Sequence, residues 1–278
     1  MTKSELPATR PTDIATRADW PQIGDIIPNH DADRPPRTNA LAGRAVSLRF
    51  SDGETAEVIF RDADRLTGRI ASEDIDVAYD GYEVRDDCYF INWRAQTSDR
   101  RTRSLFLDLL HERALLVEGR IPTPDANRID TLTRIADRKS QSVVYVVYRA
   151  ALIGDGAEAI GRTAELVGKC LRYRYSDTHL YDHIYHSERY YSWFCHNGPD
   201  RGLGDFEECD YFKLRDELYL ICWREKLLPC LAVMVEDHQA MRSMGRIIGG
   251  DAYTGEIADT MVGARMSLVA DIGLAAER

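Results

Sequence analysis

Three side chains that can hold or transfer a proton alternate along one short segment of the chain: Tyr181, His183 and Tyr185. Alternate residues of a β-strand point to the same face of a sheet, so a strand here would place two phenols beside one imidazole. An imidazole with an ordinary pKa of about 6.5 suits proton transfer at neutral pH. We therefore expect His183 to act as an acid or base. The alternative is a structural histidine packed between two tyrosines.

Neighbouring segments supply residues that could bind a small planar molecule around His183. Tyr175 and Tyr185 could orient a substrate, Trp193 could stack on it, and Arg224 or Lys226 could hold a negative group through charge-assisted hydrogen bonds. The expected catalytic residues are His183, Tyr185 and Tyr175, and the expected substrate-binding residues are Tyr173, Tyr181, Trp193, Tyr219, Trp223, Arg224 and Lys226.

These segments belong to the second of two copies of one sequence pattern. RTNALAGR at 37–44 returns as RTAELVGK at 162–169, VRDDCYFINWR at 84–94 returns as LRDELYLICWR at 214–224, and GRI at 119–121 returns at 245–247. Three matches in the same order predict an internal duplication. The separation far exceeds the roughly 20–50 residues of a solenoid repeat, so the duplicated unit is a whole domain.

One copy can be compared with the other, and one face of the strands changes character. Ala56, Val58 and Phe60 of the first copy correspond to Tyr181, His183 and Tyr185 of the second. If this face points inward, the first copy has an apolar core. The interior of the second copy would be lined by Tyr173, Tyr175, Tyr181, His183, Tyr185, Tyr191, Trp193, Tyr219 and Trp223.

Buried hydroxyl and imidazole groups without partners cost about 1–3 kcal/mol each, so such an interior favours a ligand that satisfies them. This is the reason to expect a small-molecule site in the second copy. The alternative is that the tyrosine-rich face points outward and covers a surface or a domain interface.

Charged residues near this face allow two interpretations each. Arg94 stands at the position of Arg224 in the other copy, which favours a structural salt bridge at Arg224. Glu225 and Lys226 occur only in the second copy and would be acid, base or ligand contacts, or a surface pair. The acids Asp205, Glu207 and Glu208 follow a glycine turn, where they would lie at the rim of a site or simply be solvated.

Short alternating segments joined by polar turns predict an all-β protein, either a sandwich or closed antiparallel barrels. We expect an extended N-terminal arm at 1–36, pinned by Trp20 and 26–27, then a first barrel at 37–125. A connector at 126–161 would carry one strand at 143–149, which belongs to one barrel or to their interface. The second barrel would span 162–278, and a small barrel has room for one small ligand.

The composition narrows the class of function. A net charge of −10 argues against a nucleic-acid-binding surface. No apolar run reaches the length of a membrane span, and residues 1–7 lack the apolar core of a signal peptide, so a cytoplasmic protein is expected. The six cysteines form no Cys-x-x-Cys pair, and His183 and His186 would point to opposite faces of a strand. We therefore expect no disulfide, metal or cofactor.

Motifs across both copies resemble the MoaF family. They are Tyr175-Ser176-Asp177, Tyr181-x-His183-Ile184-Tyr185, Tyr191-x-Trp193-x-Cys195, Gly202-Leu203-x-Asp205, Trp223-Arg224-Glu225-Lys226 and, in the first copy, Tyr89-Phe90-Ile91-Asn92-Trp93. The resemblance covers about residues 40–250 and implies two tandem lipocalin-like (calycin) barrels. The family carries the label molybdenum cofactor biosynthesis protein F, although none of these residues is a recognisable pterin- or molybdate-binding feature.

The leading hypothesis is a cofactor-independent enzyme, a lyase, decarboxylase or isomerase, that transfers a proton on a small aromatic or anionic metabolite in the second barrel. A tyrosine-lined barrel is similar in style to the phenolic acid decarboxylases, an architectural analogy only. The alternative is a non-catalytic small-molecule binding protein linked to molybdenum cofactor biosynthesis. A third hypothesis is a purely structural partner protein with no cavity. The first barrel would serve as scaffold or as the surface of a homodimer.

Overall fold

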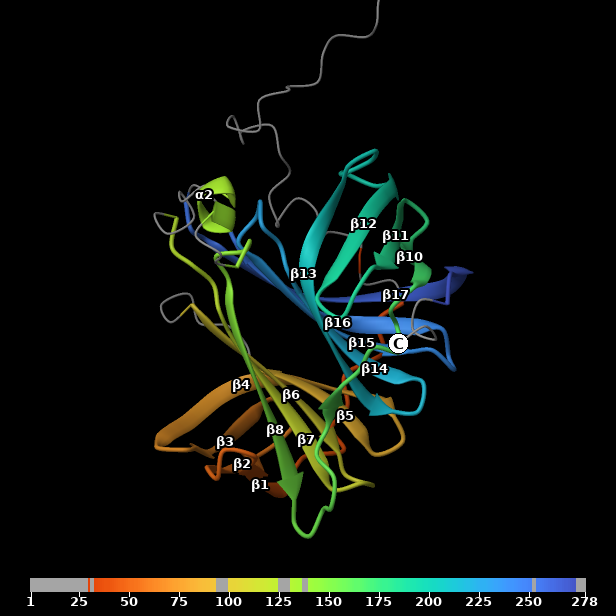
Figure 1. Cartoon of the computed structure of the whole chain (residues 1–278). Helices are drawn as coiled ribbons and strands as arrows, with labels where there is room; N and C mark the ends of the chain where they lie inside the picture. The colour runs from red at the N-terminus through yellow and green to blue at the C-terminus, as the bar shows by residue number, and fades with distance from the viewer. Residues whose placement is uncertain are drawn as a thin grey trace, which may run out of the picture.

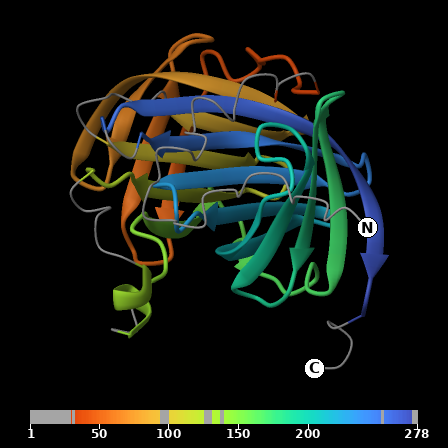
Figure 2. The same ribbon diagram turned by 90° about the horizontal axis from the view of Figure 1, so that it is seen from above.

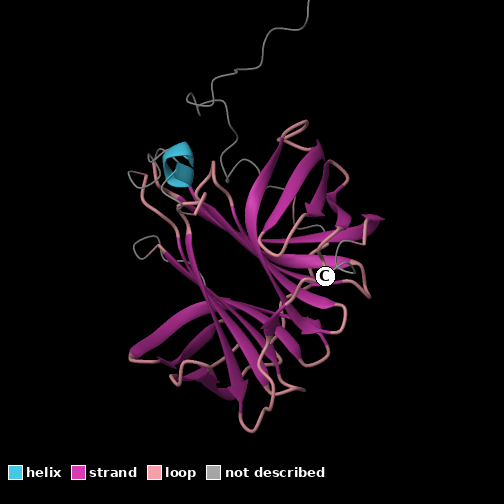
Figure 3. Ribbon diagram, viewed as in Figure 1, coloured by secondary structure: helices cyan, strands magenta, loops and turns pink. Residues whose placement is uncertain are grey.

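The computed structural model describes residues 30, 33–93, 100–124, 131–136, 140–251 and 254–273. This part of the chain consists almost entirely of strands, with one short helix, α2 (Thr131–Ala136) (Figures 1 and 3). No helix within these ranges is long and apolar enough to cross a membrane.

Eight antiparallel strands close the first barrel in sequence order (Figure 1). They are β1 (Ala45–Phe50), β2 (Thr55–Phe60), β3 (Arg65–Ile70), β4 (Glu73–Arg85), β5 (Cys88–Trp93), β6 (Arg101–Asp108), β7 (Arg113–Arg120) and β8 (Tyr145–Ile153). The strand expected in the connector is β8, which pairs with both β7 and β1 and so completes this barrel. The first barrel therefore extends to Ile153, beyond the boundary expected at 125.

The second barrel repeats this arrangement. Its strands are β10 (Lys169–Ser176), β11 (His179–Tyr185), β12 (Tyr190–Asn197), β13 (Gly204–Arg215), β14 (Leu218–Arg224), β15 (Cys230–Asp237), β16 (Arg242–Gly250) and β17 (Ile257–Asp271). The β10–β17 and β12–β13 pairings close it, and the short strand β9 (Gly161–Arg162) adds to one end of β13. Two closed antiparallel barrels confirm the predicted fold class and the duplication.

Equivalent hairpins show the duplication at the level of the backbone. Asp87 in the β4–β5 turn and Glu217 in the β13–β14 turn both have positive φ, 56° and 50°. A single left-handed residue at the end of a tight turn, with a bulge beside it, is a common way to close a short hairpin. Both hairpins also have a register shift at the same place, between Glu83 and Arg85 and between Lys213 and Arg215.

Side-chain alternation assigns the inner face of each barrel. In the first barrel the inner face is apolar, with Val46, Leu48, Phe50, Ala56, Val58 and Phe60 in one buried cluster. The corresponding cluster of the second barrel contains seven tyrosines: Tyr173, Tyr175, Tyr181, Tyr185, Tyr191, Tyr211 and Tyr219. The prediction that the tyrosine-rich face points inward is confirmed.

A third buried cluster joins the barrels. Outer-face residues of the first barrel, such as Phe90 and Phe106, pack with outer-face residues of the second, such as Leu220 and Val233. Seen from above, the blue strands of the second barrel overlie the yellow strands of the first (Figure 2). Arg85 adds an ion pair to Asp237 at 2.6 Å across this interface. Burying each large apolar side chain stabilises the contact by about 1.5–3 kcal/mol, so the barrels form one unit.

The described part of the N-terminal arm packs on the second barrel. Trp20 and residues 26–27, expected to pin the arm, lie outside the described residues. The amide of Gly263 in β17 donates to the carbonyl of His30 at 2.8 Å, and Arg265 pairs with Asp33 at 2.8 Å. The arm thus reaches past its own barrel to the other one.

Candidate functional site

The interior of the second barrel has two chemically different ends. We call upper the end formed by the loops 177–178, 198–203 and 225–229, and lower the end formed by the turns 186–189, 216–217 and 238–241. Strand register places His183 between the two ends, because its Cα partners are Leu171 and Trp193 in the neighbouring strands.

A hydrogen-bonded group of three side chains occupies the lower end. The hydroxyls of Tyr173 and Tyr185 lie 2.6 Å apart, and both donate toward Oε1 of Glu236, at 2.5 and 3.1 Å. All three side chains are buried. Burial, reinforced by the charge of Glu236, raises the pKa of both phenols. We call Tyr173, Tyr185 and Glu236 the lower triad; both tyrosines keep their protons at neutral pH, and Tyr173 is placed to relay one to the carboxylate.

The lower triad continues toward the edge of the barrel. Nε2 of His238 lies 3.1 Å from the other oxygen of Glu236. The ring of His238 packs against Tyr219, whose hydroxyl donates to Glu165 at 2.8 Å. His238 is in the turn after β15, so a titratable side chain at the barrel end contacts the buried carboxylate directly.

His183 is buried against aromatic rings and makes no side-chain hydrogen bond to the residues that the structure describes. Its ring centroid lies 4.2 Å from Tyr173, 5.2 Å from Tyr191 and 5.6 Å from Trp223. Burial lowers the pKa of His183 to about 3. The imidazole is therefore neutral at pH 7, with one N–H and one bare nitrogen available to a ligand.

Acidic side chains occupy the upper end. Glu207 is buried on the inner face of β13, and Glu225 follows β14 in the same inward register as Trp223. Burial, with the charge of Glu225 added, raises the pKa of Glu207. Burial first and Asp200 second raise the pKa of Glu225 to about 7. Glu225, which together with Glu207 we call the upper acid pair, therefore titrates near neutral pH.

The other residues expected at the upper end contact acidic and aromatic side chains. Tyr181 donates to Asp200 at 3.1 Å. The ring of Tyr175 lies 4.6 Å from that of His30, which the N-terminal arm brings to the barrel. The indole nitrogen of Trp193 is buried with no acceptor among the described residues, whereas that of Trp223 lies toward the carboxylate of Glu225. One indole donor and one imidazole therefore remain available inside the barrel.

The structure brings most of the expected site residues together but places two elsewhere. Arg224 points to the outer face of β14, where it pairs with Glu208 at 3.0 Å and Asp210 at 3.4 Å. Residues alternate along the strand, so Trp223 faces inward and Arg224 outward. Lys226 lies at the upper rim, where its ammonium bonds to Asp205 and to the carbonyl of Phe206. Neither cation shares the interior with His183.

Arg224 instead lines a groove of about 680 Å³ between the barrels, together with Tyr148, Arg162 and Asp210. Asp210 accepts from Tyr148 at 2.7 Å and pairs with Arg162, so the charges of this groove are largely matched. The structural salt bridge considered for Arg224 is the arrangement observed.

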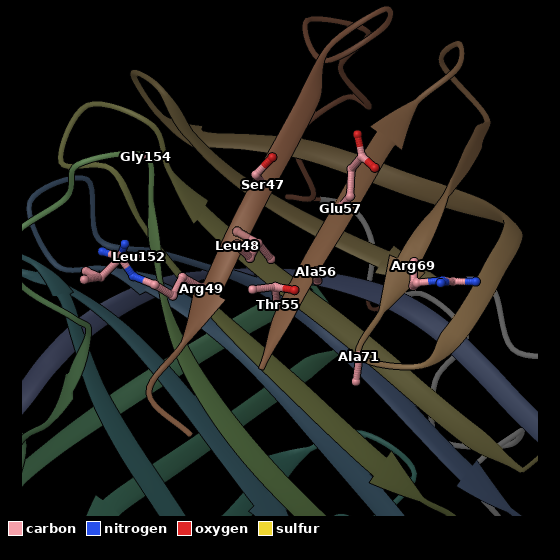
Figure 4. A pocket seen from close by; sticks show the side chains of 10 residues that line it. All are labelled: Ser47, Leu48, Arg49, Thr55, Ala56, Glu57, Arg69, Ala71, Leu152 and Gly154. Atoms are coloured by element: carbon pink, nitrogen blue, oxygen red, sulfur yellow. The ribbon is translucent and has the colours of Figure 1, made fainter. Parts of the chain in front are cut away.

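A second hollow of about 590 Å³ lies on the first barrel (Figure 4). Side chains of β1 to β3 line it, including Arg49, Glu57 and Arg69. Among the described residues of this lining, no buried polar atom lacks a partner. The unpartnered polar groups of the second barrel make its interior the stronger candidate.

Glu236 is the residue that sequence comparison missed. Strand pairing gives its counterpart: Leu105 and Leu107 pair with Ile91 and Tyr89, as Met234 and Glu236 pair with Ile221 and Tyr219. The lower triad therefore replaces Leu48, Phe60 and Leu107 of the first barrel. Copy comparison did not reveal Glu236, because the offset between the copies changes along the chain and no matching block fixes it at β15.

Within the described residues, no group of three or more His, Cys, Asp or Glu side chains is arranged to hold a metal ion. All six cysteines are free thiols, and five of them are buried.

Comparison with known proteins gives matches in both halves of the chain. The family model described as MoaF N-terminal domain matches residues 18–123, and that described as MoaF C-terminal domain matches residues 160–272. "Protein MoaF" of Klebsiella aerogenes is 34% identical over 191 residues, which is 67% of this chain and 71% of that protein. A crystal structure described as "a putative beta-lactamase from Burkholderia vietnamiensis" is 20% identical, covers 39% of this chain and 100% of that one, and has a TM-score of 0.33.

Proposed function

This chain belongs to the MoaF family, and from that premise we propose that its second barrel is a cofactor-independent enzyme site for proton transfer on a small aromatic metabolite. One observation carries the proposal. The positions of Leu48, Phe60 and Leu107 in one barrel are Tyr173, Tyr185 and Glu236 in the other. A buried carboxylate and two phenols are costly in a core, so a role in chemistry accounts for them better than packing does.

The hydrogen bonds that connect the three side chains of the lower triad support a role in acid–base chemistry. Tyr173 donates to Glu236, and the hydroxyl of Tyr185 lies within hydrogen-bonding distance of both Tyr173 and Glu236. When Tyr185 takes a hydrogen bond from a substrate hydroxyl or enol, a proton can shift along this chain toward Glu236, and His238 on its other oxygen links it to the barrel end. An isomerisation that moves a proton between two substrate atoms needs no external oxidant or reductant.

His183 has a different role in this proposal from the one expected from sequence. An imidazole with a pKa of about 3 is a weak base at neutral pH. We assign it the task of a neutral hydrogen-bonding partner that fixes the substrate between Tyr173 and Trp223. Tyr175, Tyr181, Trp193 and Tyr219 would shape the aromatic surroundings of the substrate.

Solvent isotope exchange tests the proposal without a known product. Small phenols, aromatic acids and aromatic amines are incubated in D₂O with the protein, and NMR follows replacement of carbon-bound hydrogen. We expect exchange in at least one compound, and its rate should fall at least a hundredfold in Tyr185→Phe and in Glu236→Leu, since general acid–base groups contribute about 10²–10⁴-fold. The control is Tyr190→Phe, on the outer face of β12, which should retain the parent rate.

The binding-protein alternative predicts a different pattern. A ligand would raise the unfolding midpoint of the protein, and Tyr185→Phe would weaken binding, while no compound exchanged hydrogen. Exchange that persisted unchanged in both triad variants would remove the triad from the mechanism.

A further inference from the structure

We propose that the second barrel selects a small aromatic amine in its protonated form, bound with the ammonium at Glu207 and Glu225. This inference rests on the site of the proposed function and names its substrate class. It departs from the expectation of an anionic ligand, which depended on Arg224 and Lys226 as the groups that bind the anion.

The inward charges of the second barrel are acidic. The carboxylates that face inward or close its upper end are Asp200, Asp205, Glu207, Glu225 and Glu236. Arginines of its strands pair on outer faces: Arg172 with Asp182, Arg215 with Asp108, Arg224 with Glu208 and Arg246 with Asp259. The ammonium of Lys226 forms an ion pair with Asp205. Among the described residues, an anion entering this interior would meet carboxylates and no available guanidinium.

The carboxylates at the two ends differ in what already binds them. Glu236 accepts hydrogen bonds from Tyr173, Tyr185 and His238. For the buried Glu207, the one hydrogen bond recorded among described residues is from the backbone amide of Lys226, at 3.1 Å. A buried carboxylate with so few donors is poorly compensated. An ammonium donates three hydrogen bonds and carries the complementary charge, which makes it the ligand group that satisfies the upper acid pair.

Independent groups in the same interior point to a ligand beside the acids. His183 is only 5% exposed and has no side-chain hydrogen bond to any described residue. It packs on Tyr191 and Trp223, and Tyr191 is the strand partner of Glu207. Tyr191 and Trp223 form aromatic walls, and ring faces also attract a cation. A ring bound beside His183 with an amine one or two bonds away would reach the acids.

The corresponding positions in the first barrel are apolar, as expected if the acids of the second barrel recognise a ligand. Strand pairing with Trp93 and Trp223 makes Val77 the counterpart of Glu207 and Ile75 the counterpart of Asp205. Ile75 belongs to the apolar core cluster of the first barrel, and Val77 packs against that cluster. The acids are therefore not required by the fold.

The test compares three ligands of one shape and different charge: benzylamine, benzyl alcohol and benzoate, each titrated into the full-length protein by calorimetry at pH 8. We expect benzylamine to bind at least tenfold more tightly than benzoate. Glu207→Gln and Glu225→Gln should each weaken benzylamine about tenfold, since a charged hydrogen bond is lost, and should spare benzyl alcohol. Glu208→Gln, one residue along on the opposite face, is the matched control and should leave benzylamine affinity unchanged.

The affinity for benzylamine should also rise from pH 6 to pH 8, because Glu225, whose pKa burial raises to about 7, loses its proton over this range while the amine keeps its own. The side chains that face the pair are Asp200, Asp205, Lys226, Tyr191, Trp223, Cys230 and His183. The rise in benzylamine affinity between pH 6 and pH 8 should be smaller in Glu225→Gln than in the parent.

Three results would overturn the inference. Benzoate would bind as tightly as benzylamine, benzylamine would not bind at millimolar concentration, or the affinity for benzylamine would be the same in the parent, Glu207→Gln and Glu225→Gln. Circular dichroism shows whether each variant is folded, and Glu207→Val, which copies the first barrel, gives a second substitution at that position. Failure of the proposed function would give a different result. Benzylamine would bind as expected, while substitutions in the lower triad left the rate of isotope exchange unchanged.

Discussion

Removing single members of the lower triad should destabilise the protein more than removing all three. Tyr173→Phe deletes the hydroxyl that donates to Glu236 at 2.5 Å and meets Tyr185 at 2.6 Å. A hydrogen bond to a charged group is worth about 1.5–3 kcal/mol, so this variant should lose about 2 kcal/mol of unfolding free energy. Tyr173→Phe with Tyr185→Phe leaves Glu236 with His238 alone and should lose about 3–5 kcal/mol.

The triple variant Tyr173→Phe, Tyr185→Phe and Glu236→Leu restores an apolar interior similar to that of the first barrel. Replacing all partners of a buried polar group by apolar ones is close to neutral, so its loss should be within about 1 kcal/mol. Urea denaturation followed by the fluorescence of Trp193 and Trp223 measures the differences. Tyr190→Phe, on the outer face, should stay within about 0.5 kcal/mol of the parent. Equal unfolding free energies for Tyr173→Phe and the parent, or a triple variant that loses the sum of the single losses, would contradict this expectation.

Three further predictions concern contacts around the site. Asp108 is fully buried and pairs with Arg113 of its own barrel and with Arg215 across the barrel interface; although burial opposes it, these hydrogen bonds lower the pKa of Asp108. Because the folded pKa is depressed, this stabilisation is present above the unfolded value of about 3.9 and is lost as pH falls through the folded pKa. Asp108→Asn should therefore cost about 3–5 kcal/mol at pH 7 and progressively less as the pH falls below about 4, and equal urea midpoints at pH 7 would contradict this. Gly263→Ala places a Cβ 2.4 Å from the backbone nitrogen of Arg34. This substitution should displace the N-terminal arm and speed hydrogen exchange of the amide at position 263. An unchanged exchange rate would contradict the expected displacement of the arm. Arg224→Ala should lower stability by about 1–3 kcal/mol, because Glu208 loses its guanidinium partner, yet leave benzylamine affinity within twofold in calorimetry; a larger loss of affinity would return Arg224 to the ligand site.

Much of the site could be predicted because alternation along a strand is a local property. Once Ala56, Val58 and Phe60 are matched with Tyr181, His183 and Tyr185, the whole face must point the same way in each barrel. The assignment of Arg224 to the ligand failed for the same local reason: it adjoins Trp223 and so faces outward. Glu236 could not be recognised, because its role depends on lying opposite Tyr173 and Tyr185, which are 63 and 51 residues away.

The sequence alone determined the duplication, the all-β class and the aromatic inner face, because repeated blocks and a two-residue period need no knowledge of distant contacts. Tertiary structure decided the rest. Closure of the sheet made β8 the last strand of the first barrel, and it brought the lower triad into contact. Burial then set the proton chemistry, lowering the pKa of His183 and raising that of Glu225, since desolvation depends on everything that surrounds a group and not on its neighbours in the chain.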